Sequence, residues 1–203
     1  MCKKLARLIF LAGLFPLPAF PLPPWPEAIR GSWKEIKTPE PLPPFCRPKQ
    51  MGESGHLLHS NIPGLNHFCD SKVKHFICWK YQGKDKAACL SYLARGIYDA
   101  IEGAQQNAPN HPLVPYLYTE YAKFLAEAGD HQQAIQAYLN AIRKNKKYLP
   151  AYARLADLLI KTKQYDEAEK TLQYALKIQK NKRYEAYLKK QLAKLSALRQ
   201  SSQ

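Results

Sequence analysis

The strongest constraint on the fold is an internal repeat of 34 residues in the second half of the chain. Residues 115–148 and 149–182 share one pattern of aromatic, alanine and leucine positions. A period of this length with small residues at fixed offsets is typical of stacked antiparallel helix pairs, because small side chains are needed where two helices cross closely. The repeated pairs are Tyr118 and Tyr152, Ala122 and Ala156, Leu125 and Leu159, Ala134 and Ala168, and Ala141 and Ala175.

Proline is concentrated at the other end of the chain. Eleven of the 16 prolines precede residue 50, so the first quarter of the chain cannot form part of a helical array. Proline-rich segments run extended and cannot fold alone. We therefore expect residues 20–63 to form an extended arm and loop that lies across the helices.

Residues 1–19 have the features of an export signal. Lys3, Lys4 and Arg7 form a positively charged start, and residues 8–15 are almost continuously apolar. This apolar run is too short to span a bilayer and suits a secretory signal peptide. We therefore expect a periplasmic or secreted protein, or a membrane-tethered one if the signal is not cleaved.

Apolar residues at helical spacing predict two helices ahead of the repeats, at 64–81 and 86–107, which form a hairpin within residues 64–112. The two repeats occupy residues 113–182. Residues 183–203 are expected to cap the array, because the end of a repeat array needs a polar outer face. The other expected helices are 115–128, 131–145, 149–162, 165–179 and 183–199. The predicted fold is all-α, a right-handed stack of antiparallel helical hairpins with a proline-rich N-terminal arm.

Four cysteines follow the expected signal, and an even number in an exported chain favours disulfides, with three connectivities open. If the first two helices pack antiparallel, Cys78 and Cys89 flank their turn and are close enough to bond. That leaves Cys46 in the arm to pair with Cys69, which would tie the arm and Phe45 to the first helix. The alternative is a thiol-redox or metal-handling factor that uses the same four cysteines.

The net charge is +15, and from Arg143 onward there are 16 Lys or Arg against five acidic residues. Cations at helix C-termini are favoured by the helix dipole, which explains part of this excess. The remainder could attract an acidic partner, another polyanion or a membrane surface. Nucleic acid is not expected as a partner, because export removes most encounters with it and few aromatics interleave the charges.

Motifs for catalysis are missing from the sequence, which contains no nucleophile elbow, glycine-rich phosphate loop or paired-carboxylate motif. His56 and His59 have no third ligand at metal-binding spacing. We therefore expect no enzyme activity, no cofactor and no metal site.

The repeated positions resemble the tetratricopeptide repeat. This resemblance implies a non-catalytic protein-interaction scaffold that binds a peptide or protein in a groove lined by the first helix of each repeat. Lys123 stands where chaperone-binding members of the family have Asn, so recognition of a chaperone's C-terminus is not implied. The implied groove positions are Tyr116, Thr119, Lys123, Ala126, Glu127, Ala153, Asp157, Ile160 and Lys161.

A second resemblance lies ahead of the repeats. The segments at 42–46 (Leu-Pro-Pro-Phe-Cys) and 64–69 (Gly-Leu-Asn-His-Phe-Cys) are similar to those of exported bacterial tetratricopeptide proteins of unknown role. The similarity covers about residues 40–180. It implies that Cys46 pairs with Cys69 and that Cys78 and Cys89 are a local addition, and it implies no biochemical activity.

Overall fold

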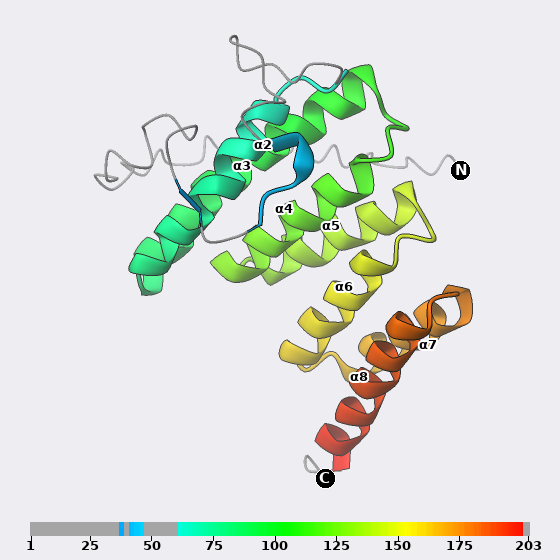
Figure 1. Cartoon of the computed structure of the whole chain (residues 1–203). Coiled ribbons are helices and arrows are strands. Elements are labelled where there is room, and N and C mark those ends of the chain that lie inside the picture. Colours follow the sequence, from blue (N-terminus) through cyan, green and yellow to red (C-terminus); the bar gives the residue numbers. More distant parts are fainter. Residues whose placement is uncertain (1–36, 39–40, 47–60, 201–203) are drawn as a thin grey trace, which may run out of the picture.

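A computed structural model describes residues 37–38, 41–46 and 61–200 of the 203-residue chain. The expected export signal, most of the expected arm, and His56 and His59 lie outside the described residues. Within the described residues the fold is all-α, with seven α-helices and no strand (Figure 1). The helices are α2 (Leu65–Lys74), α3 (Gly83–Asn107), α4 (Val114–Ala128), α5 (His131–Lys144), α6 (Leu149–Lys161), α7 (Tyr165–Ile178) and α8 (Lys182–Gln200), and two 3₁₀ helices are η2 (Pro44–Cys46) and η4 (His75–Lys80).

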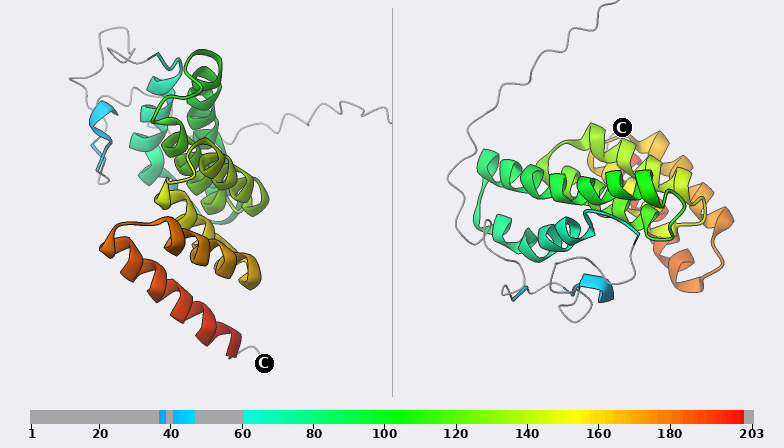
Figure 2. Two further views of the ribbon diagram at one scale, coloured as in Figure 1. Left: turned by 90° about the vertical axis from the view of Figure 1, so that its right-hand side faces the viewer. Right: turned by 90° about the horizontal axis from the view of Figure 1, so that it is seen from above.

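Each helix packs against the next one in the chain, from α2 to α8. Helix α4 also contacts α6, and α6 contacts α8. The helices therefore form a stack in which α4, α6 and α8 follow one another on one side, with α2 and α3 at one end and α8 at the other (Figures 1 and 2). This arrangement confirms the fold class predicted from the repeat.

The alanines that define the repeat lie in the core. Ala134, Ala141, Ala168 and Ala175 all have no exposed surface, as expected for residues at close helix crossings. The turn inside each repeat also follows the 34-residue period, because Gly129 and Lys163 both adopt the left-handed conformation, with φ of 92° and 61°. That conformation costs a residue with a Cβ about 1–2 kcal/mol, so the repeat geometry overrides the local preference of the lysine.

The first expected helix, 64–81, changes winding at His75. It is α-helical to Lys74 and continues as the 3₁₀ helix η4 to Lys80. A 3₁₀ helix has three residues per turn and rises about 2.0 Å per residue. Cys78, in this tighter segment, is bonded to Cys89 in α3, which begins at Gly83 rather than near Lys86. The disulfide thus links the two helices on either side of a short turn.

Two glycines on α3 let the chain that enters α2 approach closely. A Cβ at Gly103 would lie 2.1 Å from the carbonyl oxygen of Pro63, and one at Gly96 would lie 3.1 Å from that of His67. The two glycines are seven residues apart and so face the same side of α3. Their spacing marks the crossing of α2 over α3, which the sequence analysis did not identify.

The described part of the arm is tied to α2. A disulfide joins Cys46 in η2 to Cys69, with the two Cα atoms 5.3 Å apart, and Cys78 is joined to Cys89. The Phe45 ring packs 5.8 Å from that of Phe68. Both predicted disulfides and the predicted packing of Phe45 are therefore confirmed. No helix within the described ranges combines the length and apolar character needed to cross a membrane.

Candidate partner-binding groove

The inner side of the stack carries two adjoining hollows along α4, α6 and α8. One has a volume of about 200 Å³ and lies between α4 and α6, and the other has about 590 Å³ and lies between α6 and α8. Arg154 and Asp157 line both, so the two hollows form one continuous groove. The remaining lining residues are Lys123, Ala126, Glu127, Tyr138, Leu158 and Lys161 in the first hollow, and Pro150, Ala153, Asn181, Arg183, Tyr184 and Tyr187 in the second.

Helix α6 sets the floor of this groove. Pro150 lies in its first turn, where a missing N–H costs nothing. Ala153 and Asp157 are four residues apart and therefore lie on the same face of the helix. The Tyr187 hydroxyl of α8 donates a 2.7 Å hydrogen bond to the Asp157 carboxylate. Burial, and then this carboxylate, raise the pKa of Tyr187, so the phenol stays a donor that holds α8 against α6.

The open groove has more cations than anions. It is lined by Lys123, Arg154, Lys161 and Arg183 against two carboxylates, Glu127 and Asp157. Glu127 is paired with His75 and Lys123, and Asp157 accepts the Tyr187 hydroxyl. Neither Lys161 nor Arg183 forms an ion pair with any residue in the described part of the chain. The groove therefore presents positive charge that the described residues do not neutralise.

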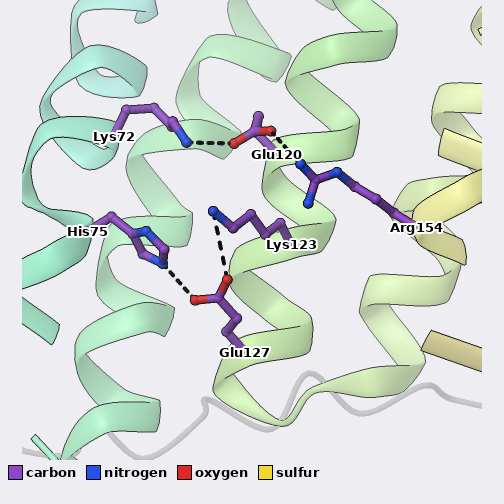
Figure 3. A network of polar contacts seen from close by, with 6 residues as sticks. All are labelled: Lys72, His75, Glu120, Lys123, Glu127 and Arg154. Carbon is purple, nitrogen blue, oxygen red and sulfur yellow. Dashed lines mark hydrogen bonds and ion pairs between the residues drawn. The ribbon is translucent and has the colours of Figure 1, made fainter. Parts of the chain in front are cut away.

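The end of the inner side nearest α2 is closed by a network of charged side chains (Figure 3). Lys72 Nζ lies 2.7 Å from Glu120, and both side chains are almost fully buried. The Arg154 guanidinium approaches the same carboxylate at 4.0 Å. His75 Nε2 lies 2.6 Å from Glu127. These contacts join α2 and η4 to α4 at Glu120, near its middle, and at Glu127, in its last turn. The residues of α4 that line the open groove begin at Lys123.

Some of the groove residues expected from the sequence line the open groove, and the others do not. Thr119 is 1% exposed and donates a hydrogen bond to the backbone oxygen of Pro115. Tyr116 packs edge-on against Phe45, with ring centroids 6.3 Å apart, and also contacts Phe68. These two residues do not line the open groove, and Ile160 is 7% exposed. The expected residues that line it are Lys123, Ala126, Glu127, Ala153, Asp157 and Lys161.

The contribution of α8 was missed by the sequence analysis, which treated this helix only as a polar cap. Asn181, Arg183, Tyr184 and Tyr187 form one wall of the larger hollow. The repeat contains a signal that could have found them, because Tyr187 lies 34 positions after Ala153. Helix α8 thus lies where the first helix of a third repeat would lie.

The cysteines do not take part in this groove. Cys46, Cys69, Cys78 and Cys89 are all fully buried and bonded in pairs. In this oxidised form they offer no thiolate for redox chemistry or for a metal. In the described ranges, no group of three or more His, Cys, Asp or Glu side chains is arranged to hold a metal ion.

Comparison with known proteins identifies part of this stack. The family model described as tetratricopeptide repeat matches residues 125–192, from the last turn of α4 to Leu192 in α8. A search of curated proteins found no match to the chain. The family match confirms the resemblance seen in the sequence and includes the Tyr187 position on α8.

Proposed function

We propose that this chain, which carries tetratricopeptide repeats at residues 125–192, is a non-catalytic interaction scaffold that binds an extended segment of a protein partner in the groove of α4, α6 and α8. Repeats of this family imply binding to a protein partner. The observation that carries the proposal is the continuity of the two hollows through Arg154 and Asp157. A continuous groove suits an extended chain rather than a compact small molecule.

The charge of the groove favours an acidic partner segment. Lys161 lines the first hollow and Arg183 the second, each without an ion-pair partner among the described residues, and Arg154 lines both. Complementary charge speeds association and disfavours basic competitors. Tyr184 and Tyr187 add aromatic surface of the kind that is enriched where binding energy concentrates.

A second candidate function is binding of a polyanion or membrane surface through the outer face of α8. Lys182, Lys190 and Lys194 are exposed there, and none is paired with a carboxylate in the part of the chain that the structure describes. Salt dependence separates the two functions. Binding to a polyanion weakens steeply as salt rises, because bound counterions are released, whereas groove binding that includes aromatic contacts weakens less.

We further propose that the protein acts in the cell envelope or is secreted. The charged and apolar start of the sequence supports export, and two buried disulfides are typical of oxidising compartments. Residues 1–40 fused to an export-dependent reporter should make that reporter active. A reporter that stays in the cytoplasm and inactive would contradict the proposed location.

Site-specific photo-crosslinking in the native cell tests the groove. A photoreactive residue at Lys161 or Tyr184 should capture a protein partner, and the same residue at the exposed Ser91 on α3, which lines none of the hollows, should not. The double variant Arg154→Gln/Arg183→Gln should lower the crosslink yield about tenfold, since each 1.4 kcal/mol of lost binding changes affinity tenfold. Equal crosslinking from Lys161 and Ser91 would contradict groove binding.

A further inference from the structure

A further hollow lies on the opposite side of the stack, between α5 and α7. It has a volume of about 440 Å³ and is separate from the groove. Helix α6 contributes Tyr152 and Leu155 to it, about half a helical turn away from Ala153 and Asp157. We call it the α5–α7 pocket. Its lining residues are Leu139, Ile142, Lys146, Tyr152, Leu155, Lys170, Thr171 and Tyr174.

The pocket has a largely apolar lining and is open to solvent. Leu139 is 38% exposed and Tyr174 is 45% exposed, which makes them two of the four large hydrophobic side chains exposed in the described part of the chain. The Tyr174 ring stacks on Tyr152 with centroids 5.5 Å apart. The Tyr152 hydroxyl donates to the backbone oxygen of Lys146 and so fixes that ring. The floor of the pocket is therefore held in place by the fold.

The equivalent positions of α3 and α5 show that the fold does not require this exposed apolar surface. At the positions 34 residues earlier, Gln105 replaces Leu139 and Asn140 replaces Tyr174. Gln105 donates a hydrogen bond to the Tyr118 hydroxyl, and Arg143 donates one to Asn140. Polar side chains thus occupy the equivalent positions of the two preceding layers. Leu139 and Tyr174 are a local feature that repeat packing does not explain.

The charges around the pocket indicate the kind of partner. Lys146 and Lys170 line it, no carboxylate does, and neither lysine forms an ion pair within the described ranges. A second copy of this chain would bring the same lysines together, and the chain already carries a net charge of +15. Like charges at an interface are costly. The complementary occupant is therefore acidic and carries a bulky apolar side chain.

We infer that the α5–α7 pocket is a second docking site, which takes a peptide segment with a bulky apolar or aromatic side chain flanked by acidic residues. The apolar side chain contacts Leu139 and Tyr174, and the flanking carboxylates pair with Lys146 and Lys170. This site is independent of the groove, so one chain can hold two partner segments on opposite sides.

Selection from a random library of 12-residue peptides displayed on phage tests this inference on the full chain. The library is first depleted on the double variant Leu139→Gln/Tyr174→Asn, which carries the residues found 34 positions earlier, at Gln105 and Asn140. Both positions are exposed, so the melting midpoint of this variant should match that of wild type. Peptides that bind wild type should share an aromatic or leucine residue with Asp or Glu on both sides.

The best peptide is then synthesised, and its dissociation constant is measured by fluorescence anisotropy. Tyr174→Asn should raise the dissociation constant at least about tenfold, as expected for an aromatic residue at the centre of a binding site. Lys146→Gln/Lys170→Gln should raise it and reduce its salt dependence. Arg154→Gln/Arg183→Gln, in the groove, should leave it unchanged.

Several outcomes would overturn the inference. These are a selection without enrichment, enriched peptides without acidic residues, and an affinity that Tyr174→Asn does not change. A sedimentation mass that doubles for wild type but not for Leu139→Gln/Tyr174→Asn would assign the pocket to a second copy. Tighter peptide binding after deletion of residues 20–40 would show that the chain's own arm competes for the α5–α7 pocket.

Discussion

Replacing Lys72 by methionine should lower the free energy of unfolding by about 3–5 kcal/mol, the range for breaking a buried ion pair by removing one partner. Lys72 Nζ lies 2.7 Å from Glu120, and their side chains are 7% and 6% exposed. Methionine keeps the apolar stem but removes the charge. Among the described residues, Glu120 then keeps only the Arg154 guanidinium, at 4.0 Å, as an ion-pair partner. Urea unfolding followed by circular dichroism measures the loss.

An exposed ion pair of the same length provides the control. Lys189 lies 2.7 Å from Glu185 on α8, with side chains 66% and 38% exposed. Lys189→Met should cost far less than Lys72→Met, because water screens exposed pairs. The double variant Lys72→Met/Glu120→Leu should recover most of the stability that Lys72→Met loses. Equal losses for Lys72→Met and Lys189→Met would show that the Lys72 pair is not buried.

Cys46→Ser should lower the free energy of unfolding by about 2–4 kcal/mol, the usual contribution of a disulfide. The Cys46–Cys69 disulfide closes a loop with a sequence separation of 23. It cross-links the described part of the arm to α2. Without it, Phe45 is held on Phe68 and Tyr116 by ring contacts alone. The arm should therefore loosen while residues 113–199 remain helical.

Limited proteolysis of wild type and Cys46→Ser, with mass mapping of the fragments, measures this loosening. The arm of the variant should be cut faster, and cleavage within α4 to α7 should not change. Cys46→Ser/Cys69→Ser should behave like the single variant, because both lack the same bond. An arm that is cut at the same rate in wild type and variant would contradict a stabilising role for this disulfide.

The stack of helices could be predicted because the 34-residue period can be recognised in the sequence. The alanines at 134, 141, 168 and 175 mark close crossings, and all four are fully buried. The disulfide between Cys78 and Cys89 could be predicted because two cysteines that flank the turn of a helical hairpin lie close in space. Local pattern and short-range geometry were sufficient for these features.

The groove was predicted only in part, because its shape depends on contacts that are distant in the sequence. Family positions placed Tyr116 and Thr119 on the inner side, but Tyr116 packs against Phe45 of the arm and Phe68 of α2, and Thr119 is buried. Lys72 and Glu120 are 48 residues apart, and a charged residue on an amphipathic helix is ordinarily assigned to the solvent face. Their burial together follows from how α2 packs on α4, which the repeat does not specify.

The wall of the groove that α8 forms could have been predicted from the 34-residue period, but it was not. The match of residues 125–192 to the family extends into α8, and Tyr187 lies one period after Ala153. The few acidic residues and many lysines of this helix suggested a solvated cap. Its inner face instead supplies Arg183 and Tyr187 to the groove.

Hydrogen–deuterium exchange of the full chain, with and without the partner segment identified by crosslinking, tests most directly whether that segment binds in the groove. A bound ligand slows the local opening of the elements that it contacts. We expect slower exchange in α6 and in the first half of α8, and unchanged exchange in α2 and α3. Unchanged exchange in α6 and α8, or slowing confined to α5 and α7, would contradict groove binding.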